Sequence, residues 1–348
     1  MTMSPELHRI LLSISLGALA GVLLALLLSL FLRLTLLFFF HHHHHQNPPI
    51  FSPNIDPKSL HLALNSPLTI QVGPTYSKTI LDSGLTVAVK RIDRLNGNSR
   101  KVELELELMS KLRHRNIMSL RGYFRGPAGN GLLLVYDYMA TGSLADLMVM
   151  VWRGEARVGW EDRLRVAVGV VKGLEFLHFG CDPRVLHCNM KPSNVMLDGG
   201  FEARLGDIGI AQGSGNGDEN ANEDRDGNSA AFMAPESCLN SRYTDKSDIY
   251  SFGVILAMLL TGKNPTDPFF LEAGNGGSIS RWLRQLQHAG EARQALDRSM
   301  ILDTREGTEV EEEMLMAVRI AVVCMSDYQA DRPSSDELVP MLTQLHSF

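Results

Sequence analysis

The stretch His187–Asp198, which reads HCNMKPSNVMLD, decides the fold. It follows the pattern H-R-D-x-K-P-x-N with two changes, because Cys188 stands in the place of the Arg and Asn189 in the place of the Asp. Turns made of His, Lys, Pro and Asn are ordinary on protein surfaces, but this order and spacing over twelve residues favours a specific loop. The stretch therefore predicts a site loop in which an amide has replaced an acid.

The loop resembles the catalytic loop of protein kinases. In that family the Asp accepts the proton of the substrate hydroxyl, and the Asn holds a magnesium ion. The resemblance implies a metal-binding role for Asn194, a catalytic-loop role for Lys191 and a structural role for His187. Asn189 occupies the position of the base, yet an amide carries no charge and takes up no proton near neutral pH. Whether the chain is an enzyme depends on this residue.

Length and composition indicate a globular protein with a membrane segment. The 348 residues suit about two domains or one large bilobal domain, and 45% of them are hydrophobic. A net charge of -6 provides no basic stripe for phosphates, so nucleic acid is not expected as a partner. The four cysteines show no C-x-x-C spacing and indicate free thiols in a reducing compartment; they are Cys181, Cys188, Cys238 and Cys324.

The segment Ile10–Leu32 is predicted to be a transmembrane helix. It contains 23 residues without a charge, which at about 1.5 Å rise per residue span roughly 34 Å, enough for a hydrocarbon core of about 30 Å. A cleaved signal peptide is the rival interpretation, because Ala18-Leu19-Ala20 resembles a cleavage site. Apolar residues continue to Phe40, interrupted only by Arg33, which favours an uncleaved signal anchor. The free thiols and the resemblance to kinases place the C-terminal part of the chain in the cytosol.

The predicted membrane helix leaves a tail of only nine residues, 1–9, on its other side. Such a tail is too short for a ligand-binding domain, so another chain would have to sense the signal. Gly17 and Gly21 are spaced as G-x-x-x-G, which lets two membrane helices approach closely, although glycines are also simply common in such helices. Residues 41–65 read as a juxtamembrane linker, and His41–His45 suit contact with lipid headgroups better than a metal site.

The next part of the chain resembles the N-terminal lobe of a kinase. Thr69–Val72 and Leu85–Ile92 are rich in Val and Ile and predict an antiparallel hairpin around a turn at residues 82–84. Val87-Ala88-Val89-Lys90 resembles the strand whose Lys contacts the nucleotide phosphates. The glycine-rich loop expected before it retains a single glycine, Gly73, followed by a proline without an N–H group. Nucleotide binding is therefore doubtful on this ground alone.

Residues 102–108 alternate Val, Glu and Leu, which by periodicity alone predicts a strand. Leu104, Leu108 and Leu112 also fall on one face of a helix. The resemblance favours the helix and implies that Glu105 pairs with Lys90, whereas a solvated glutamate is the plainer alternative.

Further motifs follow in the order of the family. Leu132–Tyr138 resembles the hinge between the lobes, with Tyr136 lining the nucleotide pocket. Asp162–His178 is an amphipathic helix that ends near Gly180. Leu205-Gly206-Asp207-Ile208-Gly209 resembles D-F-G with Ile in place of Phe, so the resemblance implies that Asp207 is a magnesium ligand together with Asn194. ATP and Mg²⁺ are the cofactors implied, if any are bound.

Residues 213–229 cannot bury a core, and their position matches the activation segment of kinases. In an active kinase a phosphate on this segment pairs with the Arg of H-R-D. Cys188 removes that Arg, so we expect a phosphate on Ser214 or Ser229 to lack this partner.

The residues that support the fold match better. Glu236 in Ala-Pro-Glu and Arg332 in Asp-Arg-Pro resemble the buried ion pair of the family, and Asp248 resembles the helix residue that anchors the catalytic loop. Ser334 and Glu337 form a capping box for the last helix.

The resemblance covers residues 66–348 and implies an α+β, bilobal protein-kinase-like fold with lobes at about 66–138 and 139–348, preceded by one transmembrane helix. Within the plant receptor-like kinases, the resemblance narrows to membrane-anchored pseudokinases of CLAVATA peptide signalling in meristems. That likeness rests on the short tail, the loop and the segments Gly290–Leu296 and Met341–Phe348.

Two functions follow from this resemblance. The first is a signalling adaptor at the plasma membrane, or in the endoplasmic reticulum before assembly. Its partner would be a leucine-rich-repeat receptor-like protein without a kinase, bound through the membrane and juxtamembrane segments, with other receptor kinases as further partners. The second is a weakly active Ser/Thr kinase that uses ATP without a base.

Overall fold

The computed structural model describes residues 27–33, 55–66, 69–72, 76–92, 99–125, 132–208, 229–240, 243–272, 276–300 and 307–346. The chain divides into two compact units, Met1–Pro49 and Ile50–Phe348. In the first unit, residues 27–33 are helical with exposed side chains. No helix among the described residues is long and apolar enough to cross a membrane. Most of the predicted transmembrane helix, including Gly17 and Gly21, lies outside the described residues, so that helix stays a prediction.

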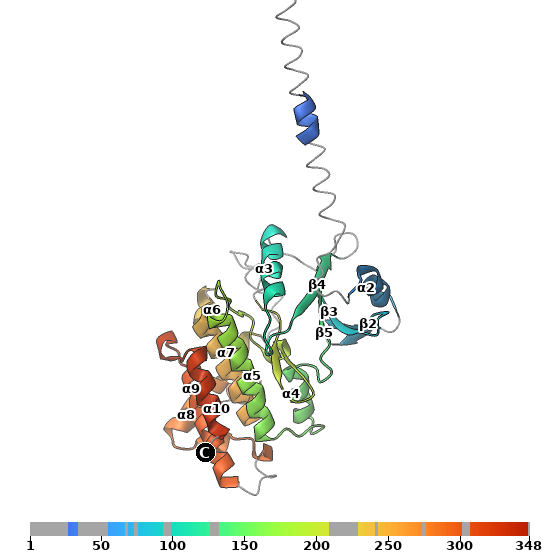
Figure 1. Cartoon of the computed structure of the whole chain (residues 1–348). Helices are drawn as coiled ribbons and strands as arrows, with labels where there is room; N and C mark the ends of the chain where they lie inside the picture. The colour runs from blue at the N-terminus through green and yellow to red at the C-terminus, as the bar shows by residue number, and fades with distance from the viewer. Residues whose placement is uncertain are drawn as a thin grey trace, which may run out of the picture. The chain divides into compact units, whose positions relative to one another are not determined.

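The N-terminal lobe of the second unit contains an antiparallel sheet of five strands (Figure 1). In spatial order the strands are β1 (Ile70–Val72), β2 (Tyr76–Ile80), β3 (Thr86–Ile92), β5 (Leu132–Asp137) and β4 (Leu120–Arg125). Because side chains alternate between the faces of a strand, Val87 and Val89 lie on one face of β3, and Ala88 and Lys90 lie on the other.

The predicted hairpin exists, but the partner strand differs from the one predicted. β3 pairs with β2, not with Thr69–Val72, and β1 pairs with the far edge of β2. Gly84 closes the turn with a φ of 80°, a conformation that glycine adopts without strain. The prediction missed β2 because Ser77 and Lys78 near its centre are polar and seldom signal a strand.

Helix α2 (Pro57–Leu64) lies inside the segment that was expected to be a juxtamembrane linker. Asp56 caps it by accepting a hydrogen bond from the N–H of Ser59 at 2.9 Å. Leu60 is 1% exposed and belongs to a hydrophobic cluster with Val87 and Val89 of the sheet. The helix is therefore a packed part of the N-terminal lobe.

Helix α3 (Ser99–Lys111) covers the residues whose alternation allowed either a strand or a helix. Leu106 and Met109 are buried in a second cluster, with Leu120 and Leu134 of the sheet. The helical interpretation taken from the resemblance is thus confirmed.

The C-terminal lobe is mostly helical. Its α-helices are α4 (Leu144–Trp152), α5 (Trp160–Phe179), α6 (Pro235–Asn240), α7 (Asp245–Thr261), α8 (Ile279–His288), α9 (Gly307–Cys324) and α10 (Ser335–Thr343). A small hairpin joins β6 (Val195–Leu197) to β7 (Ala203–Leu205). Short 3-10 turns occupy Pro192–Asn194, Ala230–Phe232, Pro268–Leu271, Ala292–Ala295, Arg298–Met300, Gln329–Asp331 and Gln344–His346.

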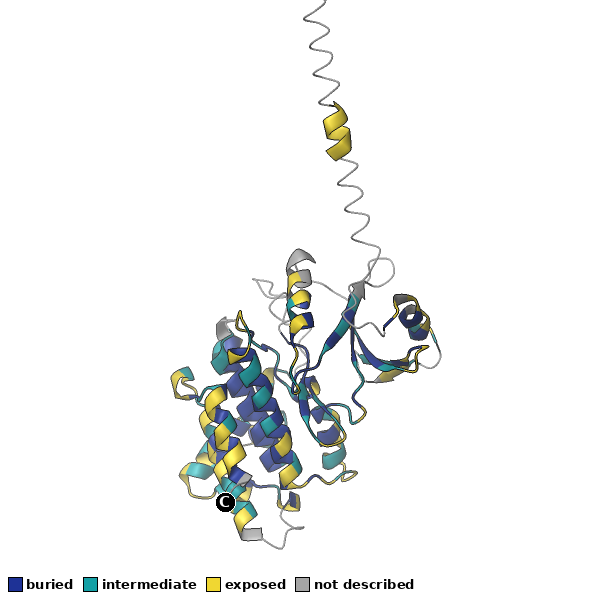
Figure 2. Cartoon of the chain, viewed as in Figure 1, coloured by how far each residue is buried: buried dark blue, intermediate teal, exposed yellow. Residues whose placement is uncertain are grey.

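Helix α7 is the centre of this lobe, and all its residues from Ser247 to Thr261 are buried. It contacts α5, α8 and α9, and the buried colour concentrates on α5 and α7 (Figure 2). Gly253 permits the close approach of α9, since a Cβ atom there would lie 2.7 Å from that of Cys324. The predicted helix Asp162–His178 lies within α5, which ends at Phe179 with Gly180 as its C-cap. The capping box of Ser334 and Glu337 is present at α10.

Candidate functional site

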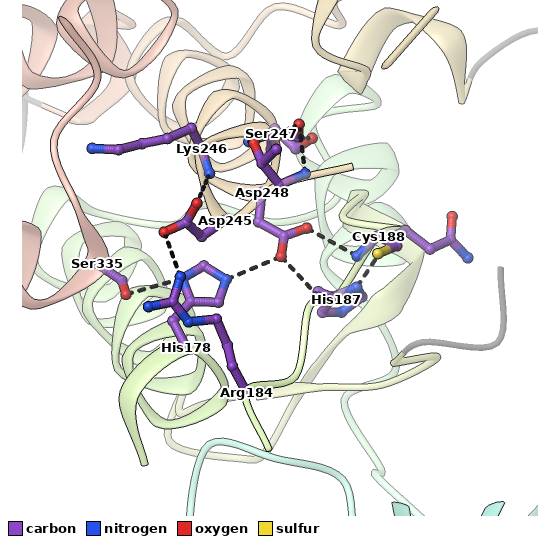
Figure 3. Close-up of polar contacts among 12 residues, drawn as sticks. His178, Arg184, His187, Cys188, Asp245, Lys246, Ser247, Asp248 and Ser335 are labelled. Carbon is purple, nitrogen blue, oxygen red and sulfur yellow. Dashed lines mark hydrogen bonds and ion pairs between the residues drawn. The ribbon is translucent and has the colours of Figure 1, made fainter. Parts of the chain in front are cut away.

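Asp248 in the first turn of α7 holds the loop His187–Asp198 (Figure 3). Its Oδ2 accepts hydrogen bonds from the N–H of His187 at 2.8 Å, and its Oδ1 from the N–H of Cys188 at 2.9 Å. Oδ2 also lies 3.0 Å from Nε2 of His178, whose Nδ1 lies 3.1 Å from Oγ of Ser335. Asp248 is 2% exposed, and these partners offset the cost of burying its charge. The loop backbone is thus fixed from the lobe interior, as the resemblance implied for Asp248.

Cys188 and His187 form the bend at the start of the loop. Cys188 has a φ of 60°, a left-handed conformation that few residues other than glycine adopt, and the bond to Asp248 holds it there. His187 is fully buried, and its Nε2 has no hydrogen-bond partner within the described residues. Burial lowers the pKa of His187 and outweighs the opposing effect of the Asp248 charge. The imidazole is therefore held in its neutral form.

The side chain of Asn194 contacts the backbone of Asn189. Nδ2 of Asn194 donates to the carbonyl oxygen of Asn189 at 2.8 Å. The side chain of Asn189 is half-buried and makes no hydrogen bond to any described residue. It provides no group that could remove a proton from a hydroxyl.

Lys191 extends from the same loop to the end of the activation segment. Its Nζ lies 3.0 Å from Oγ of Ser229. Sequence reasoning considered only the missing Arg at Cys188 as a partner for this serine and overlooked Lys191. A cation next to Ser229 was not predicted, because the two residues are 38 positions apart.

Lys90, Asp207 and Tyr76 meet where the two lobes face each other. Nζ of Lys90 forms an ion pair with Oδ2 of Asp207. The hydroxyl of Tyr76 donates to the other carboxylate oxygen, Oδ1, at 3.2 Å. The Lys90 ammonium also lies 5.3 Å from the centre of the Tyr76 ring. Asn194 is adjacent, because its carbonyl oxygen accepts a hydrogen bond from the N–H of Gly206 at 2.9 Å.

Tyr136 on β5 lies on the same face of the sheet. It pairs with Ala88 across the strands, is 2% exposed, and its hydroxyl has no hydrogen-bond partner within the described residues. Burial and the charge of Asp207 raise the pKa values of Tyr136 and Tyr76 well above their ordinary value, so both phenols are neutral. Gly73 and the side chain of Glu105 lie outside the described residues, so their predicted roles stay predictions.

Protein kinases bind ATP with Mg²⁺, using a strand Lys for the phosphates and an Asp and an Asn for the metal. Lys90, Asp207 and Asn194 are close together, as that chemistry requires. However, both carboxylate oxygens of Asp207 already have partners, and the ammonium of Lys90 is paired with Asp207 and lies beside the Tyr76 ring. In this arrangement the residues do not fit ATP with its metal.

Glu236 and Arg332 form the buried ion pair that the sequence predicted. Nη1 of Arg332 lies 2.7 Å from Oε1 and Nη2 lies 2.9 Å from Oε2 of Glu236. Oγ of Ser247 donates to the same Oε1 at 3.1 Å, and the Arg332 guanidinium lies 4.9 Å from the ring centre of Tyr250. The pair connects α6 to α7 and to the turn before α10.

The fold and the site together define the class of protein. A model of the protein kinase domain matches residues 71–340, and the chain belongs to the protein kinase family. One relative is the Arabidopsis thaliana protein named inactive leucine-rich repeat receptor-like protein kinase CORYNE, with 51% identity over 86% of this chain and 75% of the relative. Another is the LRR receptor-like serine/threonine-protein kinase FEI 2 of the same plant, with 38% identity over 77% of this chain. The chain spans 43% of the length of FEI 2.

Solved structures agree on the fold. The pseudokinase domain of BIR2, an immune regulator of the RLK/Pelle family, is 27% identical to this chain and superposes with a TM-score of 0.67. The match covers 87% of this chain and 91% of the BIR2 chain. The kinase domain of maize SIRK1 bound to AMP-PNP has a TM-score of 0.72 at 24% identity. The match covers 86% of this chain and the whole of the SIRK1 chain. The SIRK1 likeness concerns the fold alone, and the expected bilobal α+β architecture is confirmed.

Proposed function

We propose that this chain is a receptor-like pseudokinase, which keeps the shape of a protein kinase and does not transfer phosphate. The observation that carries this proposal is Asn189, an amide at the position of the base, in a loop whose anchor Asp248 is fully engaged. The name of the Arabidopsis relative CORYNE, which includes the word inactive, supports it. A loop held in shape without its base suits a docking surface better than a reaction site.

The partner is a leucine-rich-repeat receptor-like protein that lacks its own kinase. The support is the resemblance to pseudokinases of CLAVATA signalling in meristems and the leucine-rich-repeat receptor-like kinases among the relatives. The predicted membrane helix and juxtamembrane segment would bind this partner at the plasma membrane, or in the endoplasmic reticulum during assembly. The lobes would then lie in the cytosol and recruit other receptor kinases, and lipid headgroups would contact His41–His45.

A phosphate-transfer assay tests the pseudokinase part of the proposal. The full chain, purified in detergent, is incubated with labelled ATP and either Mg²⁺ or Mn²⁺, beside the Lys90→Ala variant. We expect equal background labelling of both proteins. Labelling of the unmodified chain that is lost in Lys90→Ala would overturn the proposal, because a contaminating kinase would label both proteins alike.

That outcome would instead support a weakly active Ser/Thr kinase, the second candidate. The observation in its favour is that Lys90, Asp207 and Asn194 are retained as neighbours. Positioning and electrostatics supply most of the catalysis of phosphoryl transfer, whereas a base contributes about 10²–10⁴-fold. Loss of the base alone therefore leaves room for slow transfer.

Recovery of the partner tests the adaptor part. We expect Gly17→Leu combined with Gly21→Leu to reduce co-purification with the receptor-like protein, because larger side chains separate paired membrane helices. Leu19→Phe, on the opposite face of the predicted helix, is the matched control and should leave recovery unchanged. Equal recovery of the partner with all variants would exclude Gly17 and Gly21 as the contact between the two membrane helices.

A further inference from the structure

Tyr76 stands directly across from Lys90 in the sheet. The two residues are register partners of β2 and β3, so their side chains lie on the same face. This face is opposite to the one that carries Val87 and Val89, which pack with α2. The Tyr76 ring therefore lies next to the ammonium group that a nucleotide phosphate would need, with its centre 5.3 Å from Nζ.

The hydroxyl of Tyr76 reaches the other lobe. It donates to Oδ1 of Asp207 at 3.2 Å, across 131 positions of the sequence. Asp207 is 4% exposed, and its second oxygen, Oδ2, accepts the ammonium of Lys90. Each carboxylate oxygen of the expected metal ligand thus has one donor from the N-terminal lobe.

The contact between Tyr76 and Asp207 joins a hydroxyl donor to a carboxylate oxygen. A hydrogen bond to a charged group is among the stronger ones in proteins.

Phosphates and a divalent cation would need the same atoms that these contacts use. A phosphate would have to approach Lys90 where the Tyr76 ring lies, and a cation would have to reach oxygens that already accept a phenol and an ammonium. Binding therefore has a cost, because a contact between the lobes must break first.

We propose that Tyr76 is an internal competitor of nucleotide, which holds Lys90 and Asp207 together and keeps the two lobes joined without ATP. The inference rests on the proposed pseudokinase function and gives it a physical cause other than the missing base. Tyr76 is a positioning residue here. It closes the site through the hydroxyl and covers Lys90 with the ring.

Nucleotide affinity of the full chain tests this proposal. Isothermal titration with ATP in the presence of Mg²⁺, and separately of Mn²⁺, is carried out on the unmodified chain, Tyr76→Phe and Tyr76→Leu. We expect Tyr76→Phe, which removes one oxygen atom, to bind at least about tenfold more tightly, and Tyr76→Leu to gain more since the ring is also lost. Lys90→Ala added to Tyr76→Phe should abolish the gain in ATP affinity, which would show that ATP binds at Lys90.

Tyr328→Phe is the matched control, because Tyr328 is 75% exposed in the C-terminal lobe. Thermal unfolding of each variant without nucleotide shows that it is folded, and Tyr76→Leu supplies the test if Tyr76→Phe does not fold. Equal affinity of the unmodified chain and both Tyr76 variants would overturn the inference. That result leaves the pseudokinase proposal standing, since the latter fails only on phosphate transfer that depends on Lys90.

Discussion

Arg332 binds Glu236 through both ends of its guanidinium group, with Nη1 2.7 Å from Oε1 and Nη2 2.9 Å from Oε2. Arg332 is 1% exposed and also donates from Nη1 to the carbonyl oxygen of Lys246 and from Nε to that of Ser326. Burial, the largest single effect, raises the pKa of Glu236. The hydrogen bonds from Arg332, a backbone N–H and Ser247, together with the charge of Arg332, lower it by more in total, so the net pKa is below the ordinary value. The pair exists in its charged form and ties together segments 96 residues apart.

Arg332→Ala should destabilise the protein by about 3–5 kcal/mol, because the substitution leaves a carboxylate without its partner in a largely buried place. Urea unfolding measures the change. Lys111→Ala is the control, since Lys111 pairs with Glu107 on an exposed helix face and should cost no more than about 0.5 kcal/mol. Similar costs for the two variants would contradict a structural role of the buried pair.

Leu60→Ala should destabilise the N-terminal lobe by about 2–5 kcal/mol, as truncation of a buried leucine does in other cores. Leu60 is 1% exposed on the buried face of α2, whereas Leu62 on the same helix is 66% exposed. Leu62→Ala is therefore the matched control, with an expected change within about 0.5 kcal/mol. The urea midpoints of the two variants check this. If Leu60→Ala were as mild as Leu62→Ala, α2 would not be part of the lobe.

A decrease in pH should weaken the fold partly through His187. Its folded pKa is lowered by burial, so the unfolded chain takes up the proton at a higher pH than the folded chain does. The contribution of His187 to stability is complete above about pH 6.5, the ordinary value. It is lost as the pH falls from there through the lowered pKa.

Urea unfolding at pH 7.5 and pH 5.5 measures this loss. His187→Gln should lose less stability between the two pH values than the unmodified chain does. His114 also has a pKa lowered by burial, but it is present in both proteins and cancels in the comparison. An equal loss in the two proteins would exclude His187 as a source of the pH dependence.

Sequence reasoning was most successful where a residue acts through a fixed motif. Asp248, Glu236 and Arg332 were assigned from the resemblance to kinase motifs. In the structure Asp248 binds the loop backbone and Arg332 binds Glu236, because a buried charge needs a partner that offsets its desolvation. It failed at β2 and α2, where the pattern is weak. Ser77, Lys78 and Thr79 are held in a strand by pairing with β3, and α2 is stable because Leu60 packs on the sheet.

The contact of Tyr76 with Asp207 could not be predicted for a different reason. Single-sequence patterns report on neighbours along a helix or strand, whereas this hydrogen bond joins two lobes across 131 positions. Its only sequence signal was indirect: Tyr76 comes two residues after a proline, in the stretch where glycines were expected.

Asn189→Asp should leave the fold unchanged and should not by itself create a kinase. The Asn189 side chain is half-buried and makes no hydrogen bond to a described residue, so the change should alter the unfolding free energy by no more than about 0.5 kcal/mol. Binding of the partner should likewise be retained. Phosphate transfer from labelled ATP should stay at background. A restored base cannot act while both carboxylate oxygens of Asp207 are bound to Tyr76 and Lys90, because ATP and its metal then have no place to bind.

Asp248→Asn is the contrasting variant, because it makes the same exchange of acid and amide at a buried position. The carboxylate of Asp248 accepts from two backbone N–H groups and contacts His178, and an amide in its place turns one of its two acceptor atoms into a donor. We expect a clear loss of stability and of partner binding, since the loop loses its anchor. If Asn189→Asp disturbed binding as much as Asp248→Asn, the amide itself would be part of the docking surface; if Asn189→Asp alone restored transfer, the site would not be closed.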